Sequence, residues 1–214
     1  MRKFRLRVIT LFSLAFLFIF HLSAYADAGK GELFGYRLGD KYPVTSKTVI
    51  QYGPSDFAPT TRVFIVTAER PVKPSEIGNV YLMVSRKSYT IIEIYAHTQF
   101  ASETQKQAFA KKYAEILQAQ YPGQLFETGT HGYYATIWFG PKHDKYRLTV
   151  NVERFNMSPP FSTGLAQIKL TYVNDIDGVF NLAEKEYADF MREDVSRRGL
   201  NKGSSGSRVV KLRG

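Results

Sequence analysis

Side chains that could take part in acid–base chemistry or ligand binding are concentrated on the predicted strands of this sequence. His97 and Glu93 share one face of a strand predicted over 90–98, where such a pair could exchange protons with a substrate if it lined a cleft. No nucleophile elbow, His-Glu-x-x-His motif, P-loop or Gly-x-Gly-x-x-Gly spacing occurs in the 214 residues. The residues therefore favour a non-catalytic protein over an enzyme.

The composition gives little support to a metal or cofactor site. The chain has no cysteine, which excludes thiol nucleophiles, thiolate zinc sites and disulfides. Beyond the N-terminal segment, the histidines are His97, His131 and His143, which are far apart and are typical of solvated imidazoles. Residues 175–178 (DIDG) begin like a calcium loop, but Val179 and Phe180 stand where an oxygen ligand and a glycine are needed. We expect no metal and no cofactor, and a helix-capping role for an aspartate of this segment, Asp175 or Asp177.

Aromatic residues instead mark a candidate binding surface. A solvated sheet face is ordinarily polar, whereas aromatic side chains are enriched at binding interfaces. The outer face of a hairpin predicted over 79–84 and 90–98 carries Tyr81, Met83, Tyr89, Ile91, Glu93, Tyr95 and His97. A second hairpin, in which Phe139 pairs with Tyr146, adds Tyr134, Trp138 and Arg147 to the candidate binding residues. Trp138 lies opposite Arg147 in this register, as a cation–π pair or as ordinary cross-strand packing.

Three alternatives explain an aromatic sheet face. The N-terminal segment, with Phe34, Tyr36, Leu38 and Tyr42, could fold across it; a partner protein or a second copy of the chain could bind it; or it could form a groove for a small ligand.

Two strand–helix units must position this surface. Thr90–Thr98 alternates with the period of a strand, and Ser102 with Gln105 forms a capping box at the start of a helix that ends before Pro122. Residues 165–173 and a helix from about Gly178 repeat the pattern, and residues 111–117 align with 185–191 at an offset of 74 (187 − 113). Either an internal duplication or two independently similar amphipathic helices explains the match.

Further strands are predicted over 62–68, 79–84, 132–139 and 145–155, and 53–61 is predicted as a loop. Pairing Val84 with Thr90 and Leu82 with Ile92 keeps the apolar faces of the first hairpin together. The order βββα-βββα predicts an α+β fold, with an antiparallel sheet of about six strands and two helices packed on one face.

Residues 1–26 have the features of a secretory signal peptide. Four basic residues precede an apolar run, Val8–Phe20, that is shorter than the roughly 20 residues of a membrane-spanning helix. Ala24-Tyr25-Ala26 then supplies a cleavage site. We therefore expect a periplasmic or secreted protein with no membrane span after cleavage, a single α+β domain over 27–198, and a disordered basic tail over 199–214.

The charge balance changes once the two ends are set aside. The formal charge is +10, but residues 27–198 carry 21 basic and 19 acidic side chains (21 − 19 = +2), so a nucleic-acid partner is not expected. The tail is expected to contact anionic surfaces weakly. We predict an exported, non-catalytic protein-binding domain of the bacterial envelope type, such as an adaptor, assembly factor or inhibitor/immunity protein, with a protein partner or a homodimer. The alternative is a periplasmic hydrolase or cell-wall-binding enzyme that uses His97 and Glu93.

Overall fold

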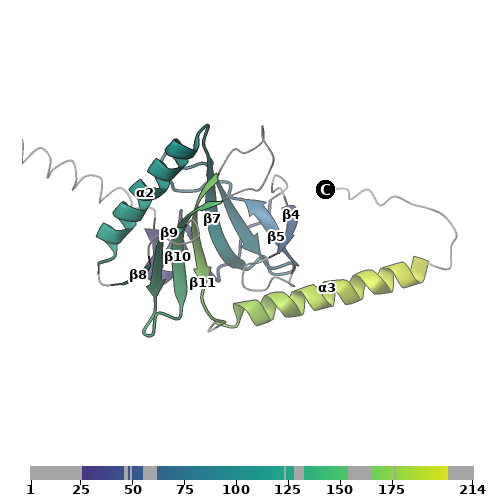
Figure 1. Ribbon diagram of the computed structural model, residues 1–214. Helices are drawn as coiled ribbons and strands as arrows, with labels where there is room; N and C mark the ends of the chain where they lie inside the picture. The colour runs from purple at the N-terminus through teal and green to yellow at the C-terminus, as the bar shows by residue number, and fades with distance from the viewer. Residues whose placement is uncertain are drawn as a thin grey trace, which may run out of the picture.

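The computed structural model describes residues 26–45, 48, 50–54, 62–122, 124–127, 133–153, 165–175 and 177–201. Within them, a central antiparallel sheet has the strand order β4-β5-β6-β7-β11-β10-β9-β8 (Figure 1). Its strands are β4 (Ile50–Pro54), β5 (Arg62–Thr67), β6 (Asn79–Val84), β7 (Ile91–Gln99), β8 (Leu125–Glu127), β9 (Tyr133–Phe139), β10 (Tyr146–Glu153) and β11 (Leu165–Tyr172). The helices are α2 (Glu103–Gln120) and α3 (Val179–Asn201), so the predicted antiparallel α+β fold with two helices is confirmed.

The sheet has eight strands rather than about six, because the strand at each edge was missed. β4 contains Gly53 and Pro54, which were predicted to lie in a loop. Proline is tolerated in an edge strand, where its missing N–H removes no ladder bond, and Pro54 pairs with Arg62. β8 has only three residues, too few for a period to show.

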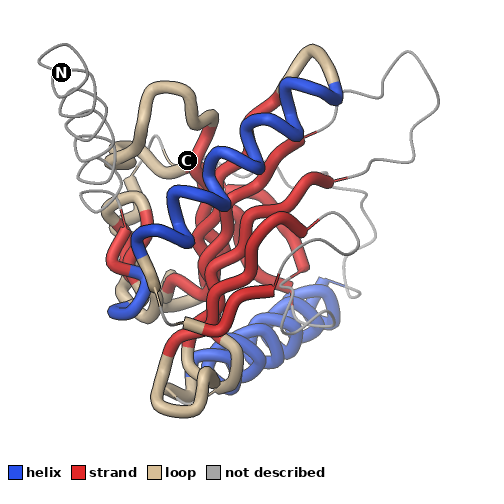
Figure 2. The backbone as a smooth tube through the Cα atoms, turned by 60° about the vertical axis from the view of Figure 1, so that its left-hand side comes forward, coloured by secondary structure: helices blue, strands red, loops and turns tan. Residues whose placement is uncertain are grey.

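Alternation along the strands gives the sheet one apolar face, which packs against α2. Leu82, Ile94, Leu148 and Leu170 lie on this face and are fully buried. Phe109, Tyr113 and Leu117 form the buried side of α2, and Tyr121 at its end packs edge-on against Phe139 of the same face. Ser102 caps α2 as predicted, since its side chain accepts a hydrogen bond from the backbone N–H of Gln105. Figure 2 shows α2 lying diagonally across the twisted sheet.

The N-terminal segment lies on the apolar face as well. It forms a small sheet of β1 (Ala26–Asp27), β2 (Glu32–Leu33) and β3 (Tyr36–Arg37), with the 3-10 turn η1 (Ala28–Lys30) between the first two strands. Gly31 (φ +77) lies so close to the Tyr146 ring that a Cβ there would be 2.9 Å from it. Tyr146 shares its face with Leu148, so the alternative in which this segment covers the aromatic face is wrong: the segment covers the opposite one.

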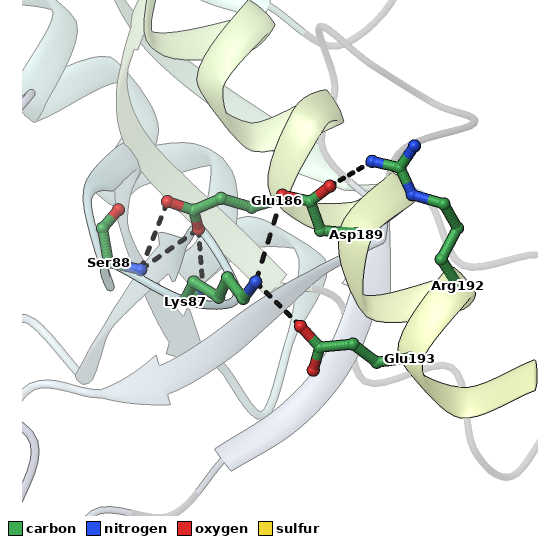
Figure 3. Close-up of polar contacts among 6 residues, drawn as sticks. All are labelled: Lys87, Ser88, Glu186, Asp189, Arg192 and Glu193. Atoms are coloured by element: carbon green, nitrogen blue, oxygen red, sulfur yellow. Dashed lines mark hydrogen bonds and ion pairs between the residues drawn. The ribbon is translucent and has the colours of Figure 1, made fainter. Parts of the chain in front are cut away.

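Helix α3 is held by hydrogen bonds and an ion pair to the loop that joins β6 and β7. The buried Glu186 carboxylate accepts hydrogen bonds from the backbone N–H groups of Lys87 (2.7 Å) and Ser88 (3.1 Å), and Lys87 Nζ lies 2.9 Å from Glu193 (Figure 3). Arg86 stacks on the Phe190 ring, 3.6 Å from its centroid. Asp175 caps the start of α3 by accepting from the N–H of Phe180, which confirms the predicted capping role.

The same loop changes the register predicted for the first hairpin. Val84 pairs with Ile91 and Leu82 with Ile94, and a β-bulge lies between Met83 and Val84. Ser85 N–H donates to Thr90 O (2.9 Å), while Tyr89 has a positive φ of 55°. The predicted pairs Val84–Thr90 and Leu82–Ile92 were wrong by one residue at Val84 and by two at Leu82. The first residue of the error arises because Ser85, which was predicted in the loop, bonds to Thr90, and the second arises because the bulge inserts one residue, which alternation does not reveal. In the second hairpin, the predicted Phe139–Tyr146 pair is confirmed.

The two central strands are related by the offset found in the sequence. Tyr95 pairs with Lys169, which lies 74 residues later (169 − 95), and the flanking pairs Glu93–Thr171 and His97–Gln167 exchange under the same offset. A two-fold axis through the Tyr95–Lys169 pair would produce this register. An internal duplication is compatible with it and stays a hypothesis.

Candidate functional site

The other face of the sheet, here called the polar face, carries the predicted binding residues. Strand pairing arranges it in three rows that cross β6, β7, β11, β10 and β9. The middle row is Tyr81, Tyr95, Lys169, Thr149 and Thr136; one flanking row holds His97, Gln167 and Asn151, and the other holds Met83, Glu93, Thr171, Arg147 and Trp138. The contacts of α2 and of the start of α3 are with the apolar face, so neither described helix is packed on the polar face.

An aromatic cluster occupies the β6–β7 side of the polar face. The Tyr95 ring is stacked on Tyr81, with centroids 5.5 Å apart, and lies 5.0 Å from the His97 ring. Tyr95 is 6% exposed, whereas Tyr81 and His97 are half-buried. The rim of the cluster is therefore accessible and its centre is not.

His97 is held in its neutral form by two features. Gln167 Nε2 is 2.7 Å from His97 Nε2, and an amide nitrogen can donate only to an unprotonated ring nitrogen. Burial lowers the pKa of His97 from its usual value, in the same direction. At neutral pH this imidazole accepts a hydrogen bond rather than carrying a positive charge.

Two ionisable side chains lie at the centre of the polar face. Glu93 is completely buried, with 0% exposure, and Lys169 is half-buried between Tyr95 and Thr149 in the middle row. Burial lowers the pKa of Lys169 to about 8, because desolvation disfavours the ammonium form. A lysine whose pKa is lowered on folding costs folding free energy wherever it remains protonated.

Trp138 and Arg147 form the opposite side of the polar face. They are a cross-strand pair, and the Arg147 guanidinium lies 5.4 Å from the centroid of the Trp138 ring. Of the two alternatives for this pair, the cation–π contact is therefore present, within the roughly 6 Å over which it is attractive.

Several buried polar atoms on this face form no hydrogen bond with the described residues. They are Trp138 Nε1, Thr149 Oγ1, Asn151 Oδ1, Gln167 Oε1 and Thr171 Oγ1. Thr149 and Thr171 are only 2% and 1% exposed. Buried polar groups in native proteins almost always have a partner, which is water or a ligand where the protein supplies none. Their concentration on one face distinguishes it from an ordinary packed surface.

The structure brings together six of the nine predicted binding residues on the polar face: Tyr81, Glu93, Tyr95, His97, Trp138 and Arg147. Tyr89 and Ile91 lie on the apolar side instead, because the bulge reverses the alternation; Ile91 pairs with Val84, and Tyr89 stacks on Phe64 at 5.9 Å. Tyr134 belongs to β9, and its side chain lies outside the described part of the structure.

Sequence reasoning missed Lys169, Gln167, Thr149 and Thr171. Alternation along β11 and β10 already separates these residues from the apolar ones. Their position beside Tyr95 and His97 required the pairing of β7 with β11, and these strands are separated by α2, β8, β9 and β10. The alternating polar residues of β11 can be recognised in the sequence, but no local pattern shows which strand β11 pairs with.

The polar face does not form a His97–Glu93 acid–base pair. The two residues are on either side of Tyr95 along β7, roughly 13 Å apart at the rise of a strand. The described residues include no group of three or more His, Asp or Glu side chains that could hold a metal ion. His143 lies in the loop between β9 and β10, and His131 lies outside the described residues.

Among the described residues, no helix is long and apolar enough to cross a membrane. The predicted signal peptide lies outside them except for Ala26. Helix α3 continues to Asn201, three residues into the predicted tail, and the remainder of the tail also lies outside the described residues. Comparisons of the chain with protein-family models, with curated proteins and with solved structures found no match.

Proposed function

We propose that this chain is an exported, non-catalytic binding domain that contacts its partner through the polar face of its sheet. The observation that supports this most strongly is the difference between the two faces of the sheet. The two helices and the N-terminal segment pack on the apolar face, while the polar face has half-buried aromatic residues and buried polar atoms that have no partner among the described residues. Tyrosine, tryptophan and arginine, which are present here, are the residues enriched in binding hot spots.

The partner first predicted from the sequence is another envelope or extracellular protein, or a second copy of this chain. Tyr81, His97 and Trp138 are half-buried on the polar face and would be available to it. Export rests on the features of residues 1–26, namely the basic start, the short apolar run and the Ala24-Tyr25-Ala26 site.

The geometry gives less support to a hydrolase. General acid–base catalysis needs the acid and the base within reach of the same substrate atoms. Glu93 is fully buried, Tyr95 separates it from His97, and His97 already accepts a hydrogen bond from Gln167. A binding domain requires none of these groups to react.

Site-specific photo-crosslinking in the native host tests this proposal. A benzophenone amino acid is introduced in place of Tyr81 or Trp138, and separately in place of Gln107, which is exposed on α2, as the matched control. We expect a defined crosslinked product from both polar-face positions and none from position 107. No product from positions 81 and 138, neither with a protein nor with a glycan, or the same product from position 107, would contradict the proposal.

A further inference from the structure

The buried polar atoms of the polar face indicate which chemical groups a ligand of this face must carry. Trp138 Nε1 is a donor, Asn151 Oδ1 and Gln167 Oε1 are acceptors, and the Thr149 and Thr171 hydroxyls can do both. The five atoms are distributed over three adjacent strands, β9, β10 and β11. A ligand that satisfies them must itself both donate and accept at several closely spaced points, as a series of hydroxyl groups does.

Aromatic side chains lie on both sides of this hydrogen-bonding region. The Tyr81–Tyr95–His97 cluster is on β6 and β7, and Trp138 is on β9. Between Tyr95 and Trp138 there are three strand-to-strand steps, which at about 4.8 Å each give a separation of roughly 14 Å. A ligand that contacts both aromatic sides therefore has to be an extended chain rather than a single small ring.

Other ligand classes fit this arrangement less well. An apolar ligand would leave the buried polar atoms without partners. A flat protein surface would contact the half-buried residues but would not reach Thr149 and Thr171, which are only 2% and 1% exposed.

We infer that the polar face binds a saccharide chain, with sugar rings against the aromatic side chains and sugar hydroxyls paired with the Thr149, Thr171, Asn151 and Gln167 side chains. This inference rests on the proposed binding function and names its ligand class. The five polar atoms are buried, and Lys169 pairs with Thr149 and lies between Gln167 and Thr171 along β11. Its long flexible side chain is the one that has to move aside when the ligand hydroxyls enter.

A glycan microarray tests the inference. The wild-type protein is compared with Thr149→Val and Thr171→Val, which remove one hydroxyl each, and with Thr104→Val on the exposed side of α2 as the control. We expect the wild type and the control to bind an oligosaccharide and not its monosaccharide. In titrations with that oligosaccharide, each polar-face variant should lose about fivefold or more in affinity, the value of one hydrogen bond. Chemical unfolding should show both variants to be at least as stable as wild type, because each removes a buried hydroxyl that has no partner among the described residues.

An array on which the wild type binds no oligosaccharide overturns the inference, as does binding that both variants retain in full. The crosslinking experiment then separates this failure from that of the proposed function. If the array shows no binding but a protein is crosslinked at positions 81 and 138, the partner is a protein rather than a saccharide. The proposed binding function then stands and only the saccharide inference fails. An empty array without crosslinks contradicts both.

Discussion

Replacement of Lys169 by methionine should make the protein more stable. Methionine keeps the unbranched side chain and its packing beside Tyr95 and Thr149, and removes the charge. The ammonium group is half-buried on the polar face, and burial lowers its pKa from 10.5 to about 8. A lysine whose pKa falls on folding is destabilising wherever it remains protonated, so its removal should raise the free energy of unfolding at neutral pH.

The pKa values set the size of this gain. The difference between 10.5 and about 8 is 2.5 pK units (10.5 − 8), and each unit corresponds to about 1.4 kcal/mol, which gives about 3 kcal/mol as an upper value. Solvent screens part of the charge because the side chain is not fully buried. We therefore expect Lys169→Met to stabilise the protein by about 1–3 kcal/mol at pH 7.

The pH dependence separates this effect from a simple change in packing. The folded pKa is the lower one, so between pH 8 and 10.5 the unfolded chain binds more protons than the folded chain, and wild-type stability rises with pH. Lys169→Met lacks this titration. Its advantage over wild type should therefore be full below pH 8, should shrink by about 1–2 kcal/mol by pH 9.5, and should be nearly lost above pH 10.5.

Urea unfolding of the two proteins at pH 7 and pH 9.5 measures both quantities. Lys111→Met on α2 is the matched control, since the Lys111 side chain is 74% exposed, and it should change stability by less than about 0.5 kcal/mol. The reasoning would be refuted if Lys169→Met were destabilising at pH 7, or if its gain were the same at both pH values. Either result would mean that favourable charge interactions in the fold offset the desolvation of Lys169.

Three further predictions concern other parts of the chain. Glu186→Gln should lower stability by about 1.5–3 kcal/mol at pH 7. Burial alone would raise the pKa of Glu186, but the hydrogen bonds from Ser88 and Lys87 lower it. The stabilisation by Glu186 is therefore present above pH 4.5 and is lost as pH falls through the folded pKa. Equal effects of the substitution in urea unfolding at pH 7 and pH 3 would contradict this. Ser102→Ala should cost about 1 kcal/mol in thermal unfolding, and no change would show that this cap is unimportant. N-terminal sequencing of the exported protein should begin at Asp27, and an intact Met1 would contradict export by cleavage.

Local periodicity was sufficient to predict most of the fold. The alternation of 90–98 and the capping box at Ser102 identified β7 and α2, and both lie within a few residues of the predicted bounds. The apolar pattern also placed Tyr81, Tyr95 and His97 on one face, although the predicted register was wrong by two residues. A shift of two preserves the faces, which explains why the surface was correct while the pairs were not.

The remaining features depend on contacts that no local pattern encodes. The bulge beside Val84 belongs to a loop that Glu186, nearly 100 residues later, helps to hold through the N–H groups of Lys87 and Ser88. The bulge in turn removed Tyr89 from the candidate site. Likewise, Lys169 entered the site only because β11 pairs with β7 across the centre of the sheet.

The offset of 74 residues clarifies what distinguishes the two faces. On the apolar face it relates Ile94 to Ile168 and Ala96 to Leu170, so apolar residues correspond to apolar residues. On the polar face it relates Tyr95 to Lys169 and His97 to Thr171, which have nothing chemical in common. Packing explains the first set, because both strands need an apolar surface beneath the covering elements. If the two halves arose by duplication, the residues of the polar face diverged because packing did not require them to stay apolar. The result is a face with an aromatic side and a hydroxyl-rich side. Such a face can distinguish the two directions of a bound chain, which a symmetric site cannot do.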